Sequence, residues 1–140
     1  MKLPSTYKAT DDWPSTEDDN SLGFFCRQDQ QSKNKYSPHS YGIAIDLNPL
    51  YNPAQVSSKR QDKSIKIQPE QGKPFFSKRT GHQGMINKDS EVVRIFAQHG
   101  WKWGGFWHSP ETDDMHFQKD MDSHYQAHWL QLTTTHKPAD

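Results

Sequence analysis

Aromatic side chains determine where this chain can build a hydrophobic core. Only 31% of the 140 residues are hydrophobic and the mean hydropathy is -1.11, which is polar for a folded domain. The sequence nevertheless contains five Trp, seven Phe and five Tyr, and each of these side chains can bury a large area. Many of them gather late in the chain, at Trp101, Trp103, Phe106, Trp107, Phe117, Tyr125 and Trp129. We therefore predict a single domain with an aromatic core surrounded by long polar loops.

The segment Gly42–Leu47 is the clearest strand in the sequence. Its isoleucine and leucine side chains alternate with Gly, Ala and Asp46, so one face is apolar and the other is small and acidic. A strand with a purely structural role would carry bulkier residues on that second face. The small neighbours of Asp46 therefore predict open space beside a carboxylate.

Other short elements predict the fold class. A helix is expected between a cap at Asp89 or Ser90 and a stop at Gly100, because apolar residues recur between them at helical spacing. Residues 22–26, 64–67, 101–103 and 115–118 are typical of short strands, and residues 120–132 favour a second helix. Three prolines interrupt residues 51–79, which we expect to form mainly a long ordered loop. The pattern indicates an α+β domain, a small antiparallel sheet with flanking helices.

The expected organisation is an irregular acidic arm at residues 1–22, one folded domain at residues 23–132 and a frayed tail at residues 133–140. The 17 basic and 17 acidic residues balance, so the chain lacks the positive excess that nucleic-acid binding rewards. No apolar stretch approaches the roughly 18–20 residues of a membrane span, and no signal-peptide core follows Met1. We expect a soluble monomer.

The single cysteine, Cys26, limits the chemistry further. It excludes an intrachain disulfide and any zinc site built from several cysteines of this chain. Because Cys26 follows Gly23, Phe24 and Phe25 in an apolar run, we expect a small buried side chain rather than a nucleophile.

Two histidines and one aspartate form a candidate metal site. His39 precedes the strand that carries Asp46 and can fold back over its small face, while His116 projects from the last predicted strand. Two imidazoles and a carboxylate can form a three-ligand zinc site whose fourth position stays open. The pair His124 and His128 lacks the glutamate that follows the first histidine in zincins, so we expect surface histidines there. We expect the same of the histidines without a partner pattern, His82, His99, His108 and His136.

A zinc site of this kind lowers the pKa of a bound water, and a separate carboxylate then has to carry the proton. Asp113 and Asp114 are the candidates, because both lie just before His116. Strand alternation favours Asp114, which would share a face with His116, but the spacing leaves the choice open.

Three motifs occur in order along the chain. The first is Ser37-x-His39-x-x-Gly42-x-Ala44-x-Asp46, the second is Trp103-Gly104-Gly105-Phe106-Trp107 and the third is Asp113-Asp114-Met115-His116-Phe117. Together they resemble the signature of the zinc D-alanyl-D-alanine carboxypeptidases, a VanY-like family that includes L-alanyl-D-glutamate endopeptidases of phage and bacteria. The similarity extends from about Phe25 to Gln118. It implies the α+β fold of the hedgehog and DD-peptidase superfamily, with zinc in a groove on the sheet.

The resemblance also implies the metal ligands and the catalytic base. The ligands would be His39, Asp46 and His116, in agreement with the grouping above. The base would be Asp113, which requires a turn or bulge between Asp113 and Met115.

Substrate-binding residues follow from the same resemblance. Arg27 occupies the place of an arginine that binds the substrate's carboxylate or scissile-carbonyl region, a task that suits a permanently charged, forked guanidinium. Ser37 and Trp103 are further candidates for substrate binding, although Trp103 and Trp107 fit the core equally well.

The implied function is zinc-dependent hydrolysis of a peptide bond in a bacterial peptidoglycan stem peptide or muropeptide. D-Ala-D-Ala carboxypeptidases and L-Ala-D-Glu endopeptidases share these residues, so the bond that is cut stays open. The alternative is a non-catalytic zinc-binding module that recognises wall peptide or a protein partner, because the superfamily's fold also occurs in hedgehog signalling domains. The family further implies a location in the cell envelope, in the periplasm or wall.

Overall fold

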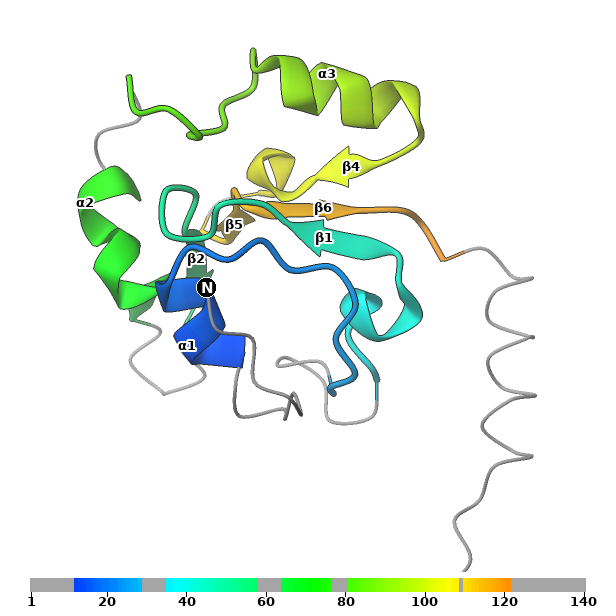
Figure 1. Cartoon of the computed structure of the whole chain (residues 1–140), viewed down its shortest axis with the longest axis horizontal. Coiled ribbons are helices and arrows are strands. Elements are labelled where there is room, and N and C mark those ends of the chain that lie inside the picture. The colour runs from blue at the N-terminus through cyan, green and yellow to red at the C-terminus, as the bar shows by residue number, and fades with distance from the viewer. Residues whose placement is uncertain (1–11, 29–34, 58–63, 77–80, 109, 122–140) are drawn as a thin grey trace, which may run out of the picture.

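Two three-stranded antiparallel sheets form the framework of the protein (Figure 1). The computed structural model describes residues 12–28, 35–57, 64–76, 81–108 and 110–121. The first sheet has the order β1-β6-β4, with β1 at Ala44–Asp46, β6 at His116–Gln118 and β4 at Lys102–Trp103. The second has the order β3-β2-β5, with β3 at Ile65–Gln68, β2 at Ala54–Ser57 and β5 at Thr112–Asp113. The predicted α+β class is confirmed, with two small sheets in place of the single sheet expected.

The register of the first sheet places Asp46 directly opposite His116. Paired residues on neighbouring strands share a face of the sheet, and the next residue along each strand faces the other way. Phe117, which follows His116, is completely buried and pairs with Trp103 of β4. One face of the sheet is therefore apolar, and the opposite face carries the histidine and the aspartate.

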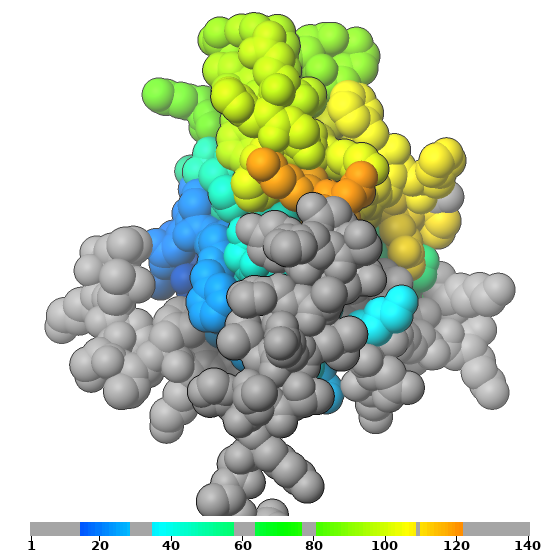
Figure 2. All heavy atoms as spheres, turned by 90° about the vertical axis from the view of Figure 1, so that its right-hand side faces the viewer, coloured from blue at the N-terminus to red at the C-terminus, as the bar shows by residue number. Residues whose placement is uncertain are grey.

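Helix α3, at Glu91–Gln98, covers the apolar face (Figure 1). Ser90 precedes it as the N-cap, and Gly100 ends it in the left-handed region at φ +78°. Its apolar stripe packs on the core residues of the sheet, with Phe96 lying 4.5 Å from Phe117 between ring centroids. Figure 2 shows α3 at the top of the molecule, above the orange residues of the β6 region. The predicted helix and its boundaries are confirmed.

Several short elements differ from the sequence-based expectation. A helix, α1, occupies Asp12–Glu17 within the arm expected to be irregular. The expected loop at residues 51–79 contains β2, the 3-10 helix η3 at Glu70–Gly72 and the helix α2 at Lys73–Phe76, in addition to the predicted edge strand β3. Strand β2 pairs with both β3 and β5, so its stability depends on Thr112 and Asp113, a distant partner that local sequence does not reveal. The second helix predicted at residues 120–132 lies almost entirely outside the described residues.

The described part of the segment before the first motif is extended and makes two isolated strand-like pairs, Leu22 with Asp46 and Gln28 with Tyr36. Phe25 points inward with 4% of its surface exposed, and the neighbouring Cys26 is exposed. The prediction that Cys26 is buried is therefore wrong, because successive side chains of an extended segment point to opposite sides. No helix among the described residues has the length and apolar character needed to cross a membrane.

Candidate metal centre

His39, Asp46 and His116 meet on the polar face of the first sheet. Their side chains lie in buried residues, with exposed fractions of 2%, 8% and 6%, and one ligand atom from each lies within 4.8 Å of the other two. Asp46 ends β1 and His116 begins β6, so the antiparallel register brings together two residues that are 70 positions apart. The sequence prediction of this grouping agrees with the arrangement in the structure.

A 3-10 helix, η2 at Pro38–Tyr41, presents His39 to the strand. Ser37 is its N-cap, and its hydroxyl accepts a hydrogen bond from the backbone N–H of His39 at 3.4 Å. Gly42 ends the turn in the left-handed conformation, at φ 69°, and its N–H donates to the carbonyl of His39. The serine and glycine of the first motif therefore build the turn that places the histidine.

Each histidine is oriented by a hydrogen bond on the side of its ring away from Asp46. His39 Nδ1 donates to the carbonyl oxygen of Gly23 at 2.8 Å, which leaves Nε2 at 3.3 Å from Asp46 Oδ2. His116 Nε2 donates to Gln118 Oε1 at 2.9 Å, which leaves Nδ1 at 2.9 Å from Asp46 Oδ1. Such outer partners fix the ring orientation of metal-binding histidines.

Neither outer partner was predicted from the sequence. Gln118 lies two residues after His116 on the same strand, so alternation could have placed it on the same face. The carbonyl of Gly23 has no such signal, because every residue carries one and only the fold brings this one to His39.

The donor set and its spacing suit a small divalent cation. Tetrahedral coordination with bonds of about 2.0–2.1 Å places ligand atoms about 3.3 Å apart. The separations of 3.3 Å and 2.9 Å between imidazole nitrogens and carboxylate oxygens are close to this value. These two separations involve different oxygens of Asp46, and the three ligand atoms lie within 4.8 Å of one another, so the three residues could hold a metal ion.

Asp46 and His116 influence each other's ionisation in the metal-free protein. Burial opposes ionisation of Asp46, but hydrogen bonds and charges from His116 and His39 hold its pKa well below its usual range. Burial likewise opposes the charge on His116, but the hydrogen bond to Asp46 and the charges of Asp113 and Asp46 raise its pKa to about 9. The metal-free site at neutral pH thus holds an ionised carboxylate beside a protonated His116.

A second carboxylate, Asp113, faces the cluster from the end of β5. A two-residue turn at Asp114 and Met115 separates β5 from β6, as the family resemblance requires. Burial, and to a lesser extent the negative charge of Asp46, raises the pKa of Asp113 to about 7. Its Oδ1 atom is buried and has no hydrogen-bond partner among the described residues. Asp114 is buried, and its backbone carbonyl accepts a hydrogen bond from Trp103 Nε1 at 2.7 Å.

A family model described as D-alanyl-D-alanine carboxypeptidase matches residues 30–119, more than half of the chain. The chain belongs to this family. No curated protein and no solved structure gives a significant match. The match covers the turn that carries His39, both strands of the metal cluster and Asp113, and it identifies the protein as a member of a peptidase, and hence hydrolase, family.

In this carboxypeptidase-family chain, Arg27 lies close enough to Asp113 to influence its ionisation. Its positive charge, like those of His116 and His39, opposes the rise in the pKa of Asp113. Ser40, which is almost fully buried, holds the backbone of Arg27: its hydroxyl accepts from the Arg27 N–H at 2.9 Å and lies 2.9 Å from the Arg27 carbonyl. The backbone of Arg27 is thus fixed next to the turn that carries His39.

Trp103 and Trp107, the two tryptophans of the second motif, occupy different environments. Trp103 belongs to the hydrophobic core and exposes 4% of its surface, which leaves little of its ring available to a substrate. Trp107 exposes 42% of its surface, and its ring lies 5.4 Å from that of His116 between centroids. The partly exposed ring of Trp107 therefore lies beside the metal cluster. The substrate-binding roles predicted for Arg27, Ser37 and Trp103 stay predictions.

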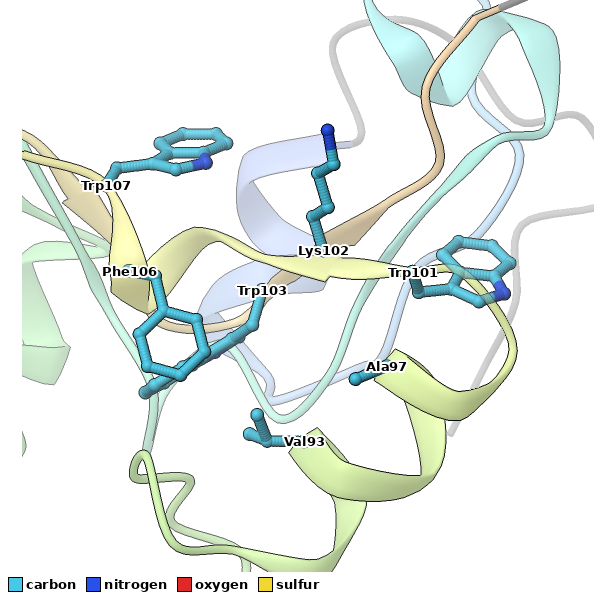
Figure 3. A pocket seen from close by; sticks show the side chains of 7 residues that line it. All are labelled: Val93, Ala97, Trp101, Lys102, Trp103, Phe106 and Trp107. Atoms are coloured by element: carbon cyan, nitrogen blue, oxygen red, sulfur yellow. The ribbon is translucent and has the colours of Figure 1, made fainter.

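An open apolar pocket of about 320 Å³ adjoins Trp107 (Figure 3). It lies along β4 between α3 and the 3-10 helix η4 at Gly104–Phe106, and is lined by Val93, Ala97, Trp101, Lys102, Trp103, Phe106 and Trp107. Figure 3 shows Val93, Trp103 and Phe106 on the helix side of the strand and Trp107 on the other side.

The remaining histidines of the described chain lie outside the cluster. His82, His99 and His108 are exposed, as predicted. His124, His128 and His136 lie outside the described residues.

Proposed function

We propose that the protein is a zinc metallopeptidase that hydrolyses peptide bonds of bacterial peptidoglycan stem peptides. The observation that carries the proposal is the buried grouping of His39, Asp46 and His116 with a second carboxylate, Asp113, facing it. Two imidazole nitrogens and one carboxylate oxygen match catalytic zinc sites, which keep a fourth position for water or substrate. The family match supports the same class of reaction.

Zinc, when bound, would polarise the scissile carbonyl and lower the pKa of the attacking water. Asp113 would accept the proton that this water loses and deliver it to the nitrogen of the leaving amine. A pKa of about 7 suits both steps, because a general acid–base group works best when its pKa is near the working pH. The unpaired Oδ1 atom of Asp113 leaves an acceptor available for that proton.

Arg27 would bind the negatively charged part of the substrate. A stem peptide that ends in D-alanine carries a free carboxylate, and a guanidinium grips a carboxylate through two parallel hydrogen bonds. Trp107 would form the adjacent wall, because its partly exposed ring lies against His116.

The substrate would be a stem peptide or muropeptide, cut either at the terminal D-Ala-D-Ala bond or at the L-Ala-D-Glu bond. We propose that the protein acts at the cell envelope, where this substrate occurs.

Incubation of the zinc-loaded protein with defined muropeptides, followed by mass spectrometry, tests the proposal. Loss of one alanine indicates carboxypeptidase action, whereas a split after L-Ala indicates endopeptidase action. The exposed His108 provides a matched control, because His108→Gln should leave the product pattern unchanged. Saturable binding of muropeptide by zinc-loaded protein without any product would instead indicate a non-catalytic binding module.

A further inference from the structure

The second sequence motif packs directly against the third. Trp103 Nε1 donates to the backbone carbonyl of Asp114 at 2.7 Å, and η4, which begins at Gly104, lies against β5. The glycines of this motif contribute neither a metal ligand nor a reacting group to the proposed chemistry. Their contact with the acidic turn indicates a different role.

Gly104 is buried at the closest point of this contact. A Cβ atom on Gly104 would collide with the carbonyl oxygen of Asp113 and would lie 3.1 Å from Asp113 Cβ. The backbone of Gly104 is outside the left-handed region, so its conformation would accept alanine without strain. The position therefore requires glycine for lack of space and not for its backbone angles.

The position of the Asp113 carboxyl group depends strongly on packing, because its Oδ1 atom has no hydrogen-bond partner among the described residues. We infer that Gly104 is a positioning residue: the absence of a side chain lets the end of β5 approach η4, and this approach sets the Asp113 carboxyl group against the metal cluster. The inference rests on the role proposed above for Asp113.

The expected effect of Gly104→Ala follows from the size of the collision. Ordinary van der Waals separation would require the Asp113 backbone to move by about 1 Å, a displacement that can cost an enzyme about 100-fold in rate. The three atoms nearest to the added methyl group all belong to Asp113, and none belongs to a metal ligand. We therefore expect kcat to fall about 100-fold, while KM and zinc affinity stay within about threefold of wild type.

A double-mutant cycle with Asp113→Asn separates positioning from general damage. If Gly104 acts through Asp113, Gly104→Ala should cost about 100-fold in the wild-type background and less than about twofold in the Asp113→Asn background. Equal losses in both backgrounds would overturn the inference. Gly105→Ala provides the contrast, because its Cβ would collide with the ring of Trp103 in the core. That variant should lower the unfolding temperature and reduce activity equally in both backgrounds.

Crystal structures of wild type and Gly104→Ala give a readout that does not depend on turnover. We expect the Asp113 carboxylate to be displaced by about 1 Å relative to His116 in the variant. An unmoved carboxylate would overturn the inference whatever the activity. Lack of turnover by the wild type on every muropeptide would count against the proposed function, and the displacement would still decide the role of Gly104.

Discussion

Zinc should bind this protein more weakly as the pH falls below about 9, because His116 must lose a proton to become a ligand. In the metal-free protein this proton lies between His116 and the ionised Asp46, and the hydrogen bond to Asp46 with the charges of Asp113 and Asp46 keeps it there although burial opposes it. Each pH unit below the pKa of a single ligand lowers the apparent affinity about tenfold. Between pH 9 and pH 7 the loss is therefore about 100-fold, which corresponds to about 3 kcal/mol.

The same protonation predicts how many protons zinc displaces. At pH 7 His116 is almost fully protonated and contributes about one proton per zinc. Asp113, with a pKa of about 7, is half protonated and releases up to roughly half a proton more when a cation binds beside it. Titration calorimetry in buffers of different ionisation enthalpy measures this number directly.

Competition with a chromophoric chelator between pH 6.5 and 9.5 measures the affinity, after correction for the chelator's own protonation. His108→Gln, which changes an exposed histidine outside the cluster, should reproduce the wild-type slope. An affinity that varies less than about threefold between pH 7 and 9, or a proton release near zero, would refute the inference that His116 is protonated without zinc and loses its proton when zinc binds.

Four further predictions follow from the site. Asp113→Asn should keep zinc affinity near the wild-type value and lose turnover by at least about 100-fold, and full activity of this variant would exclude Asp113 as the base. His116→Ala should lose both zinc and activity. Gln118→Met removes the acceptor for His116 Nε2 and should weaken zinc binding about 10–100-fold with little change in secondary structure, as measured by chelator competition and circular dichroism; unchanged affinity would mean that Gln118 does not orient the ring. Ser40→Ala should lower the free energy of unfolding by about 1–3 kcal/mol in denaturant titrations, because it leaves the N–H and carbonyl groups of Arg27 without their partner. A smaller loss would show that water replaces the hydroxyl. The metal-free protein should lose stability as the pH rises. The raised pKa of His116 gives a contribution of about 3 kcal/mol that is complete below pH 6.5 and lost as the pH passes about 9, and the raised pKa of Asp113 adds a loss between pH 3.8 and about 7. A calorimetric unfolding temperature that rises from pH 6.5 to 9 would contradict the shift of His116.

Local sequence was sufficient to predict the parts of the site that short-range geometry determines. The strand that ends at Asp46 and the helix capped by Ser90 follow from alternation and capping. The grouping of His39 with Asp46 and His116 was a candidate from the types of residue present and was supported by the family resemblance, because antiparallel register brings together residues 70 positions apart. The choice of Asp113 over Asp114 did not follow, because alternation assumes a continuous strand and the chain turns between Asp113 and His116.

Interactions between distant segments account for what the sequence did not predict. Strand β2 is short and polar, and its two neighbours in the sheet come from residues 65–68 and 112–113. The inward turn of Phe25, which exposes Cys26, depends on pairing between the segment after Leu22 and the first motif. The steric role of Gly104 likewise becomes visible only once β5 lies against η4.

The most direct test of a zinc peptidase built on His39, Asp46 and His116 is a comparison of one protein preparation in three states. Mass spectrometry of a defined muropeptide would follow the chelator-treated protein, the same protein reloaded with one equivalent of zinc, and zinc-loaded His116→Ala. We predict a new product only from the reloaded wild type, and its mass identifies the bond that is cut. Equal product from the chelator-treated protein, or no product from wild type with zinc confirmed at one per chain, would contradict the proposed function.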